Sequence, residues 1–231
     1  VMVVATTLYG NEACCAAVNT LTEQERQDGW RLLWDGKSGD GWRSIKNENF
    51  PAKGWEIANG ELTVLPKNAG GGAGDLITRE TYSSFILKVD FRLTQAANSG
   101  IKYFFDPKRN GGTTLEYQVL DAKHPDATKG RDGNRTVASL YDVMPAAGAK
   151  PKPVGEWNTA MIVSNGRQVE HWLNGEKVLA FERGSDAFRK AVALSKFNKH
   201  PNWGEQEAGH ILLQDHQDRV SYRNIKIKVL K

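Results

Sequence analysis

A stretch with an apolar residue at every second position constrains the fold of this chain more than any other feature. From Phe85 to Leu93 every odd position is apolar, and Lys88, Asp90 and Arg92 stand between them. A period of two residues is that of a β-strand with one face in a hydrophobic core, because successive side chains point to opposite sides. This segment therefore predicts a strand covered on one side only.

Asn-Gly pairs mark the turns between further strands. Asn59-Gly60 separates Trp55–Ala58 from Glu61–Leu65, and Asn-Gly between two such runs predicts a hairpin because both turn residues take positive φ. Asn165-Gly166 and Asn174-Gly175 predict a three-stranded meander in the same way. The expected strands, apart from the first hairpin, are Ile101–Phe105, Leu115–Leu120, Asn158–Ser164, Arg167–Leu173, Lys177–Phe181, Ile211–Gln214 and Val220–Val229. In the last of these the apolar phase changes near Arg223-Asn224, which predicts a β-bulge.

Two short helices are expected among the strands. Thr22 and Glu25 have the spacing of a capping box and predict a helix over Glu23–Asp28. Ser185 is a suitable N-cap for a helix near 185–196, where Phe188, Val192 and Leu194 recur at nearly helical spacing. With so little helix and no internal repeat, the chain is expected to be all-β, an antiparallel β-sandwich or a barrel.

Composition limits the classes of protein to which this chain can belong. The 231 residues are 39% hydrophobic, which suffices for a full core, and no apolar run is long enough for a transmembrane segment. The net charge of +4 is small and scattered, so no nucleic-acid partner is expected. The cysteines, Cys14 and Cys15, are adjacent and suit a structural disulfide poorly. Residues 1–28 are interpreted as an N-terminal arm, either the remnant of an export signal or an ordinary extension.

Two short segments carry candidate site residues. In Leu115–Leu120, Glu116 and Gln118 share one strand face, which is either open to a ligand or an ordinary solvated outer face. Gln214 and His216 likewise share a face, and an imidazole can act as base, acid or metal ligand, or only as a structural group. His171, in the middle of the meander, is expected to form a cross-strand pair on the solvent face.

A poorly patterned stretch over 121–156 is a second source of candidates. His124, Asp126 and Tyr141 lie in it, and a loop of this length inside a domain is usually functional. Asn98, in the Asn98-Ser99-Gly100 segment that opens a strand, is a further candidate: this segment either serves as a turn only or presents an amide to a ligand at a sheet edge. No Gly-x-Ser-x-Gly elbow, P-loop or dinucleotide fingerprint is present.

Several motifs, taken in order, resemble one known family. They are Gly29–Gly36, Asn98-Ser99-Gly100, Glu116–Asp121, Glu156-Trp157-Asn158, Trp172–Gly175, Leu213–His216 and Arg223-Asn224-Ile225. This set resembles the 3-keto-disaccharide hydrolases, whose fold is a concanavalin A-like jelly roll. The resemblance covers about 29–231, implying a single domain with a long loop insertion at 121–156. The insertion resembles a subgroup of exported bacterial proteins, which implies a periplasmic or extracellular location, with Cys14 or Cys15 as a candidate site of lipid attachment.

The resemblance implies cleavage of glycosides already oxidised to a ketone at C3. A base removes the acidified C2 proton, the C1 oxygen leaves by elimination, and water adds to the enone. Glu116 and His216 are the expected base and acid, or metal ligands. Asn98, Gln118 and Gln214 would orient hydroxyl groups, with His124, Asp126 and Tyr141 contributing from the loop. No cofactor is certain, and a divalent metal ion is a candidate stabiliser of the enolate.

Two other functions fit the same residues. A non-catalytic carbohydrate-binding module would present exposed Trp rings on the concave face, and fold alone does not fix function. A conventional endo-glucanase would need two carboxylates about 5–10 Å apart, and Gln118 stands where laminarinase-like jelly rolls carry the middle acid.

Overall fold

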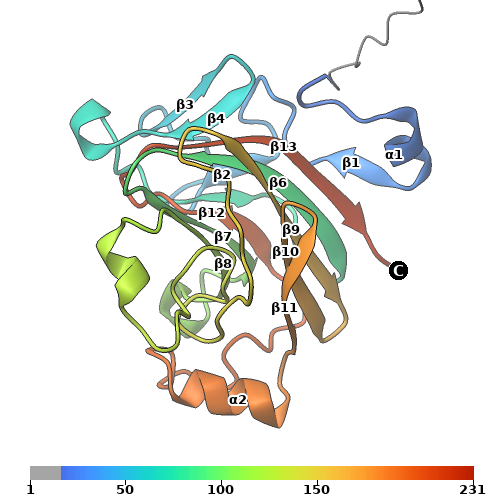
Figure 1. The fold of residues 1–231 in the computed structure, drawn as a ribbon. Coiled ribbons are helices and arrows are strands. Elements are labelled where there is room, and N and C mark those ends of the chain that lie inside the picture. Colours follow the sequence, from blue (N-terminus) through green and yellow to red (C-terminus); the bar gives the residue numbers. More distant parts are fainter. Residues whose placement is uncertain (1–16) are drawn as a thin grey trace, which may run out of the picture.

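The computed structural model describes residues 17–231 and contains two antiparallel sheets (Figure 1). The larger sheet has eight strands, with β1 paired to β13 at one side of the main path. In spatial order its strands are β11 (Glu176–Glu182), β10 (Gln168–Leu173), β9 (Trp157–Asn165), β6 (Phe85–Leu93), β13 (Val220–Val229), β4 (Glu61–Val64) and β3 (Trp55–Ala58), and β1 spans Trp30–Leu32. The expected all-β sandwich is confirmed.

The smaller sheet has five strands and carries most of the candidate site residues. Its order is β2 (Trp42–Ser44), β5 (Leu76–Thr78), β12 (His210–Leu213), β7 (Asn98–Phe105) and β8 (Leu115–Leu120). The strands β7 and β8 are paired so that Gly100 lies opposite Gln118 and Lys102 lies opposite Glu116. This register brings the candidate residues of the two strands to neighbouring positions on one sheet face.

The hydrophobic core lies between the two sheets. Strand β6 is buried at every odd position and partly exposed at every even one, as its alternation predicts. In β8 the core receives Leu115, Tyr117 and Val119, so that Glu116 and Gln118 face outward from the sandwich. The tryptophans Trp34, Trp42 and Trp55 also belong to this core.

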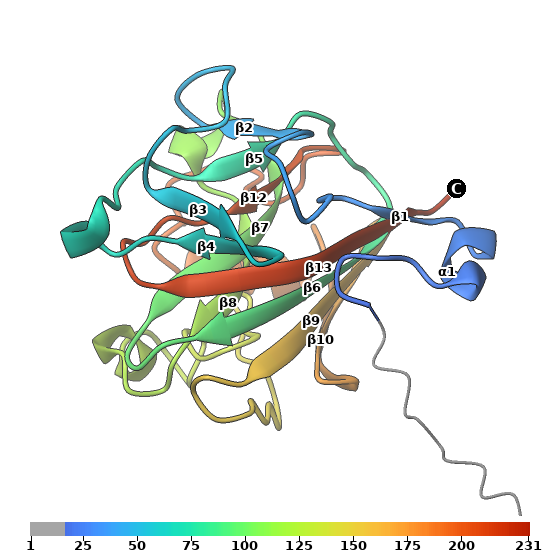
Figure 2. The same ribbon diagram turned by 90° about the horizontal axis from the view of Figure 1, so that it is seen from above.

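The local sequence signals for the turns at Asn59-Gly60 and Asn174-Gly175, for the helix cap and for the bulge are confirmed. The third turn lies one residue later than predicted, at Gly166-Arg167, because Asn165 is the last residue of β9. Thr22 forms the expected capping box with Glu25 at the start of α1 (Glu23–Gln27). The pairing of β13 with β6 shifts between Arg223 and Lys226, and Asn224 has a φ of 49°, which is the expected bulge. Figure 2 shows α1 and the C-terminal end of β13 on the side away from the loop of residues 121–156.

The second helix, α2 (Asp186–Ala193), ends before residue 196, where its prediction ended. Ser185 caps it by accepting a hydrogen bond from the backbone N–H of Phe188, and Phe188 and Val192 are its buried positions. Leu194, expected on the same buried face, is 69% exposed. The helix ends one residue earlier, so the spacing that includes Leu194 no longer describes a helical face.

The segment before the sandwich is tied to β13. Asn19 and Asn224 exchange two hydrogen bonds between side-chain oxygen and backbone N–H, and Lys226 forms an ion pair with Glu25.

No helix in residues 17–231 is long and apolar enough to cross a membrane. Cys14 and Cys15 lie outside the described residues.

The expectation of a solvent-facing His171 is wrong. This residue is 0% exposed and lies in the core, where Nδ1 donates to the carbonyl of Ala138 and Nε2 accepts from the hydroxyl of Tyr103. A carbonyl can only accept, so the neutral tautomer is fixed by these two contacts. His171 thereby ties β10 to the loop of residues 121–156.

We predict that His171 makes folding stability depend on pH. Burial lowers its pKa to about 4, whereas an unfolded chain titrates near about 6.5. Between these values the unfolded state binds the proton and the folded state does not. The free energy of unfolding therefore falls as the pH drops from about 6.5 to about 4, by a total of about 3 kcal/mol.

Urea unfolding of wild type and His171→Gln at pH 7 and pH 5 tests this prediction. Glutamine can also donate to Ala138 but does not titrate, so the variant is expected to lose about 2 kcal/mol less than wild type between these pH values. His200→Gln, on a half-buried histidine outside the core, is the matched control. Equal pH dependence in wild type and His171→Gln would contradict the assignment.

Candidate functional site

A polar pocket lies on the outer face of the five-stranded sheet. Its volume is about 160 Å³, and it is lined by Asn98, Lys102, Thr113, Thr114, Glu116, Gln118, Tyr141, Lys196, Phe197, Gln214 and His216. The strands β7 and β8 supply its floor, and the segments that follow α2 and β12 supply its sides. Of the eight residues expected to form a site, six line this pocket, and Glu116 and His216 are both among them.

Glu116 is the carboxylate at the floor of the pocket. Its residue is only 6% exposed, and its Oε2 lies 3.8 Å from Nζ of Lys102. Burial raises the pKa of Glu116 above its usual value, and the positive charges of Lys102 and Lys196 oppose this rise. The expectation of a solvated outer face at Glu116 and Gln118 is therefore wrong, because the surrounding loops cover this part of the sheet.

Gly100 makes room for the Glu116 side chain. A Cβ atom built on Gly100 would overlap with Oε1 of Glu116. The backbone carbonyl of Gly100 accepts a hydrogen bond from the backbone N–H of Gln214, so the glycine is fixed in the sheet on its other edge. Gly100, the last residue of Asn98-Ser99-Gly100, therefore forms a cradle for the Glu116 carboxylate.

Two buried amides lie beside Glu116. Nε2 of Gln118 donates to Oδ1 of Asn98 over 3.1 Å, and both residues are buried. Oε1 of Gln118 has no hydrogen-bond partner within residues 17–231. A buried acceptor without a partner is costly, so the pocket offers a place for a ligand that donates a hydrogen bond, such as a hydroxyl group.

The loop of residues 121–156 supplies one wall through Tyr141. The Tyr141 hydroxyl donates to Oδ2 of Asp126 over 2.9 Å and accepts from Nζ of Lys196 over 3.1 Å. Arg135 binds Asp126 and Asp142 through Nη1 and Nε, at 2.9 and 2.6 Å. Asp126 is not among the pocket-lining residues and instead holds Tyr141 in position.

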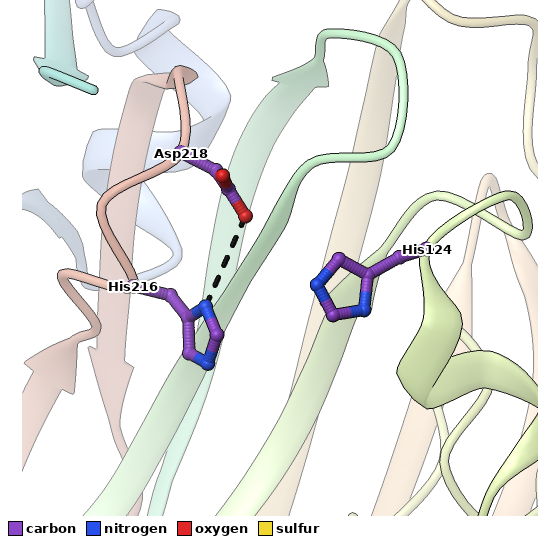
Figure 3. Close-up of side chains that lie close together, drawn as sticks. All are labelled: His124, His216 and Asp218. Carbon is purple, nitrogen blue, oxygen red and sulfur yellow. Dashed lines mark ion pairs between the residues drawn. The ribbon is translucent and has the colours of Figure 1, made fainter. Parts of the chain in front are cut away.

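A second group of side chains lies next to the pocket (Figure 3). His124, from the same loop, faces His216 with a ring-centroid distance of 5.9 Å, and Nδ1 of His216 lies 3.8 Å from Oδ2 of Asp218. One ligand atom from each residue lies within 4.8 Å of the other two. His124 does not line the pocket, but its ring faces His216, which does.

Sequence reasoning did not find Asp218 or five of the residues that line the pocket, which are Lys102, Thr113, Thr114, Lys196 and Phe197. Lys102 has a usable signal, because Asn98, Gly100 and Lys102 occupy alternate positions of one strand and share a face. Asp218 lies two residues after His216 in the same turn. Lys196 follows α2 and reaches the pocket only through tertiary packing, so no local pattern indicates it.

The fold and the pocket together define a carbohydrate-active jelly roll with one buried carboxylate. Comparison with known proteins assigns the family: residues 29–228 match the 3-keto-alpha-glucoside-1,2-lyase-like domain, and the chain belongs to this family. A 3-keto-disaccharide hydrolase from Bacteroides thetaiotaomicron is 34% identical over 250 residues, covering 96% of this chain and 86% of the relative. The family expected from the sequence motifs is confirmed.

Solved structures agree with this assignment. A proposed glycosyl hydrolase from Parabacteroides distasonis superimposes with a TM-score of 0.82 at 30% identity, covering 93% of this chain and 100% of that one. A second proposed glycosyl hydrolase from the same organism gives a TM-score of 0.65 at 26% identity, covering 87% and 99%. The jelly-roll fold extends over nearly the whole length of these relatives.

We predict that Gly100→Ala destabilises the protein through the carboxylate of Glu116. Overpacking of this kind costs about 1–3 kcal/mol, and the backbone of Gly100 itself tolerates alanine because its φ is not positive. In a Glu116→Ala background most of this cost should disappear, which a double-mutant cycle by urea unfolding measures. An equal loss of unfolding free energy from Gly100→Ala in both backgrounds would contradict the role of Gly100 in making room for the Glu116 side chain.

Proposed function

We propose that this chain cleaves glycosides whose sugar carries a ketone at C3, with Glu116 as the base. The observation that supports this most directly is the single carboxylate of the pocket. Among the described residues, Glu116 is the one carboxylate that lines it. Ordinary glycoside hydrolysis needs two, whereas elimination next to a ketone needs one base, a stabiliser for the enolate and an acid for the leaving group.

The reaction divides into elimination and addition. Glu116 takes the C2 proton, and the electrons of that C–H bond form the enolate of the C3 ketone. The enolate then expels the oxygen at C1, leaving an enone with a double bond between C1 and C2. Water adds to C1 and a proton returns to C2, so the net reaction is hydrolysis. If the chain stops before this addition, it acts as a lyase.

The environment of Glu116 suits proton abstraction. Burial raises the pKa of the carboxyl group and therefore increases its strength as a base. The positive charge of Lys102, whose Nζ lies 3.8 Å from Oε2, opposes this rise of the pKa. A carboxylate with a raised pKa is a stronger base toward the C2 proton of a keto sugar.

The other pocket residues would bind the sugar and the leaving group. The free Oε1 of Gln118 is an acceptor for a sugar hydroxyl, and the amides of Asn98 and Gln214 can orient others. His216 is exposed and lines the pocket, so it is suited to protonate the departing oxygen or to hold a divalent metal ion against the enolate. Tyr141 and Lys196 would enclose the sugar on the side of the pocket next to the loop of residues 121–156.

The two rival functions are less well supported. A carbohydrate-binding module is expected to place Trp rings where a sugar stacks, but among the described residues the aromatic side chains that line the pocket are Tyr141 and Phe197. A conventional endo-glucanase needs a second carboxylate in the pocket lining.

We further propose that residues 29–231 act as one domain, and that the protein works in the periplasm or outside the cell.

We predict cleavage of a 3-keto-glucoside and none of the corresponding ordinary glucoside. Glu116→Gln should lower kcat on the keto substrate by about 10²–10⁴-fold, the usual contribution of a positioned base, and His216→Ala should also lower it. Product release followed by chromatography measures both. Glu176→Gln, at an exposed position of β11, and His200→Ala are the matched controls.

Three results would contradict the proposal in different ways. Wild-type turnover in Glu116→Gln would remove this residue from the mechanism. Cleavage of the ordinary glucoside would favour a glucanase. Binding of both sugars without cleavage of either would favour a binding module.

We also predict that Lys102→Met moves the acid limb of the pH–rate profile to higher pH. Methionine keeps most of the apolar stem but removes the charge that lowers the pKa of Glu116. Because the base must be ionised, kcat/KM of the variant should fall at a higher pH than that of wild type. A uniform loss of activity at every pH would instead assign Lys102 to substrate binding alone.

A further inference from the structure

We propose that a groove on the outer face of the eight-stranded sheet binds an acidic polysaccharide. The groove has a volume of about 460 Å³, within the range of about 300–1,000 Å³ that is usual for ligand sites. It is lined from β6, β9 and β10, which lie side by side in that sheet, and from the segments that adjoin them (Figure 1). The inference goes beyond the proposed function, because the groove shares no residue with the pocket of Glu116 on the other sheet.

Three residues in register form the floor of the groove. Met161 of β9 lies opposite Lys88 of β6 on one side and opposite Trp172 of β10 on the other. All three are partly exposed and stand between buried residues of their strands, so their side chains point away from the core. An indole ring beside an apolar thioether offers a rigid surface for the C–H face of a sugar ring.

The indole ring of Trp172 is held in place by its neighbours. Nε1 donates to Oε2 of Glu170 over 2.8 Å, and Oε1 of Glu170 accepts from Nζ of Lys177 over 3.0 Å. Nζ of Lys177 also lies 5.6 Å from the centroid of the indole ring, but Lys177 does not line the groove and does not fill it. A ring that is fixed before a ligand arrives loses little freedom on binding, which favours affinity.

Two family motifs that the sugar pocket does not use build the other wall. Oδ1 of Asn158, from the first motif, accepts from the backbone N–H of Lys152 over 2.7 Å and from Nδ2 of Asn174 over 2.9 Å. Asn174, from the second motif, also donates through Nδ2 to the carbonyl of Lys150 over 3.2 Å. Prolines on both sides of Lys152 restrict the backbone further. The two motifs thus hold the segment that brings Lys152 to the groove.

The groove carries positive charge that no carboxylate matches. Lys88 and Lys152 line it, none of its lining residues is acidic, and neither lysine forms an ion pair within residues 17–231. Nζ of Lys88 lies 4.7 Å from the centroid of the Trp30 ring, a contact that positions the charge without neutralising it. The acidic side chains around the groove already have other basic partners, in the pairs Glu25–Lys226, Asp90–Arg223 and Glu170–Lys177.

A sugar with carboxylate or sulfate groups combines the two features that this surface recognises, an apolar ring face and negative charge. A nucleic acid combines them as well, but its binding relies on a stripe of many basic residues, whereas two lysines line this groove. The family of this chain is named for an activity on glucosides, which also favours a sugar. A polymer bound here would hold the enzyme in place while the pocket on the opposite face binds its substrate.

Calorimetric titration of acidic oligosaccharides into the full chain tests the groove. Tetragalacturonic acid is compared with its neutral methyl ester, and a sulfated galactan tetrasaccharide with its desulfated form, so that the two arms identify the acidic group. We expect at least one acidic form to bind, with its affinity falling as salt is added, and the neutral counterpart to bind about tenfold or more weakly.

Variants of the lining residues locate the binding. Trp172→Ala should lower the affinity by about tenfold or more, and Lys88→Met and Lys152→Met by about threefold to tenfold each. Two matched controls should keep wild-type affinity. They are Trp157→Ala, whose ring on the same sheet face is already covered by two arginines, and Lys190→Met on α2.

Several results would overturn the groove as a site for acidic sugars. They are the absence of binding in both arms, equal affinity for acidic and neutral forms, and wild-type affinity in Trp172→Ala. Tighter binding of a short single-stranded DNA would assign the groove to nucleic acid instead. Circular dichroism verifies that the variants fold, and Lys152→Met, at an exposed position, locates the site even where Trp172→Ala does not fold.

Glu116→Gln separates this inference from the proposed function. This variant should lose cleavage of a 3-keto-glucoside and retain oligosaccharide binding, whereas Trp172→Ala should retain cleavage and lose binding. Cleavage by a wild-type chain that binds no acidic oligosaccharide would retain the function and overturn the groove. Binding without cleavage would retain the groove and overturn the function. Loss of oligosaccharide binding in Glu116→Gln would place the ligand in the pocket and overturn the groove.

Discussion

The burial of one carboxyl group, that of Glu116, is the constraint on which the site depends. A carboxylate moved out of water is stable only with a compensating charge or hydrogen bonds. Lys102 supplies the charge from the opposite position of the neighbouring strand, and Gly100 leaves the space. The register of β7 against β8 must therefore be kept, because a shift of one residue would turn Lys102 and Gly100 away from the carboxylate and into the core.

The loop of residues 121–156 is held to the sandwich from two sides. From the core, His171 binds the carbonyl of Ala138, a residue with a φ of 65°, and so fixes a strained part of the loop backbone. On the outside, Arg135 joins Asp126 to Asp142, and Asp142 accepts from the backbone N–H of Lys196. The wall of the pocket therefore derives its position from the core and from charge pairs together.

Sequence reasoning succeeded where the signal is local and failed where burial is decided by distant segments. The alternation of Phe85–Leu93, the capping box at Thr22 and the bulge at Asn224 depend on neighbouring residues alone, and all three are confirmed. His171 shares its strand face with the buried Val169 and Leu173, so its alternation already indicates the core, and the wrong prediction came from its polarity. At Glu116 the covering segments come from other parts of the chain, so its burial has no local signal. Lys196 escaped prediction for the same reason.

The pocket separates a dry floor from a wet rim, and this division suits an elimination followed by addition of water. The Glu116 side chain is 7% exposed, whereas those of His216 and Asp218 are 47% and 35% exposed. Strands supply the floor, where low solvation would strengthen Glu116 in its proposed role as base, and turns supply the rim, where groups can exchange protons with solvent. A leaving group that departs at the rim makes way for the water that replaces it.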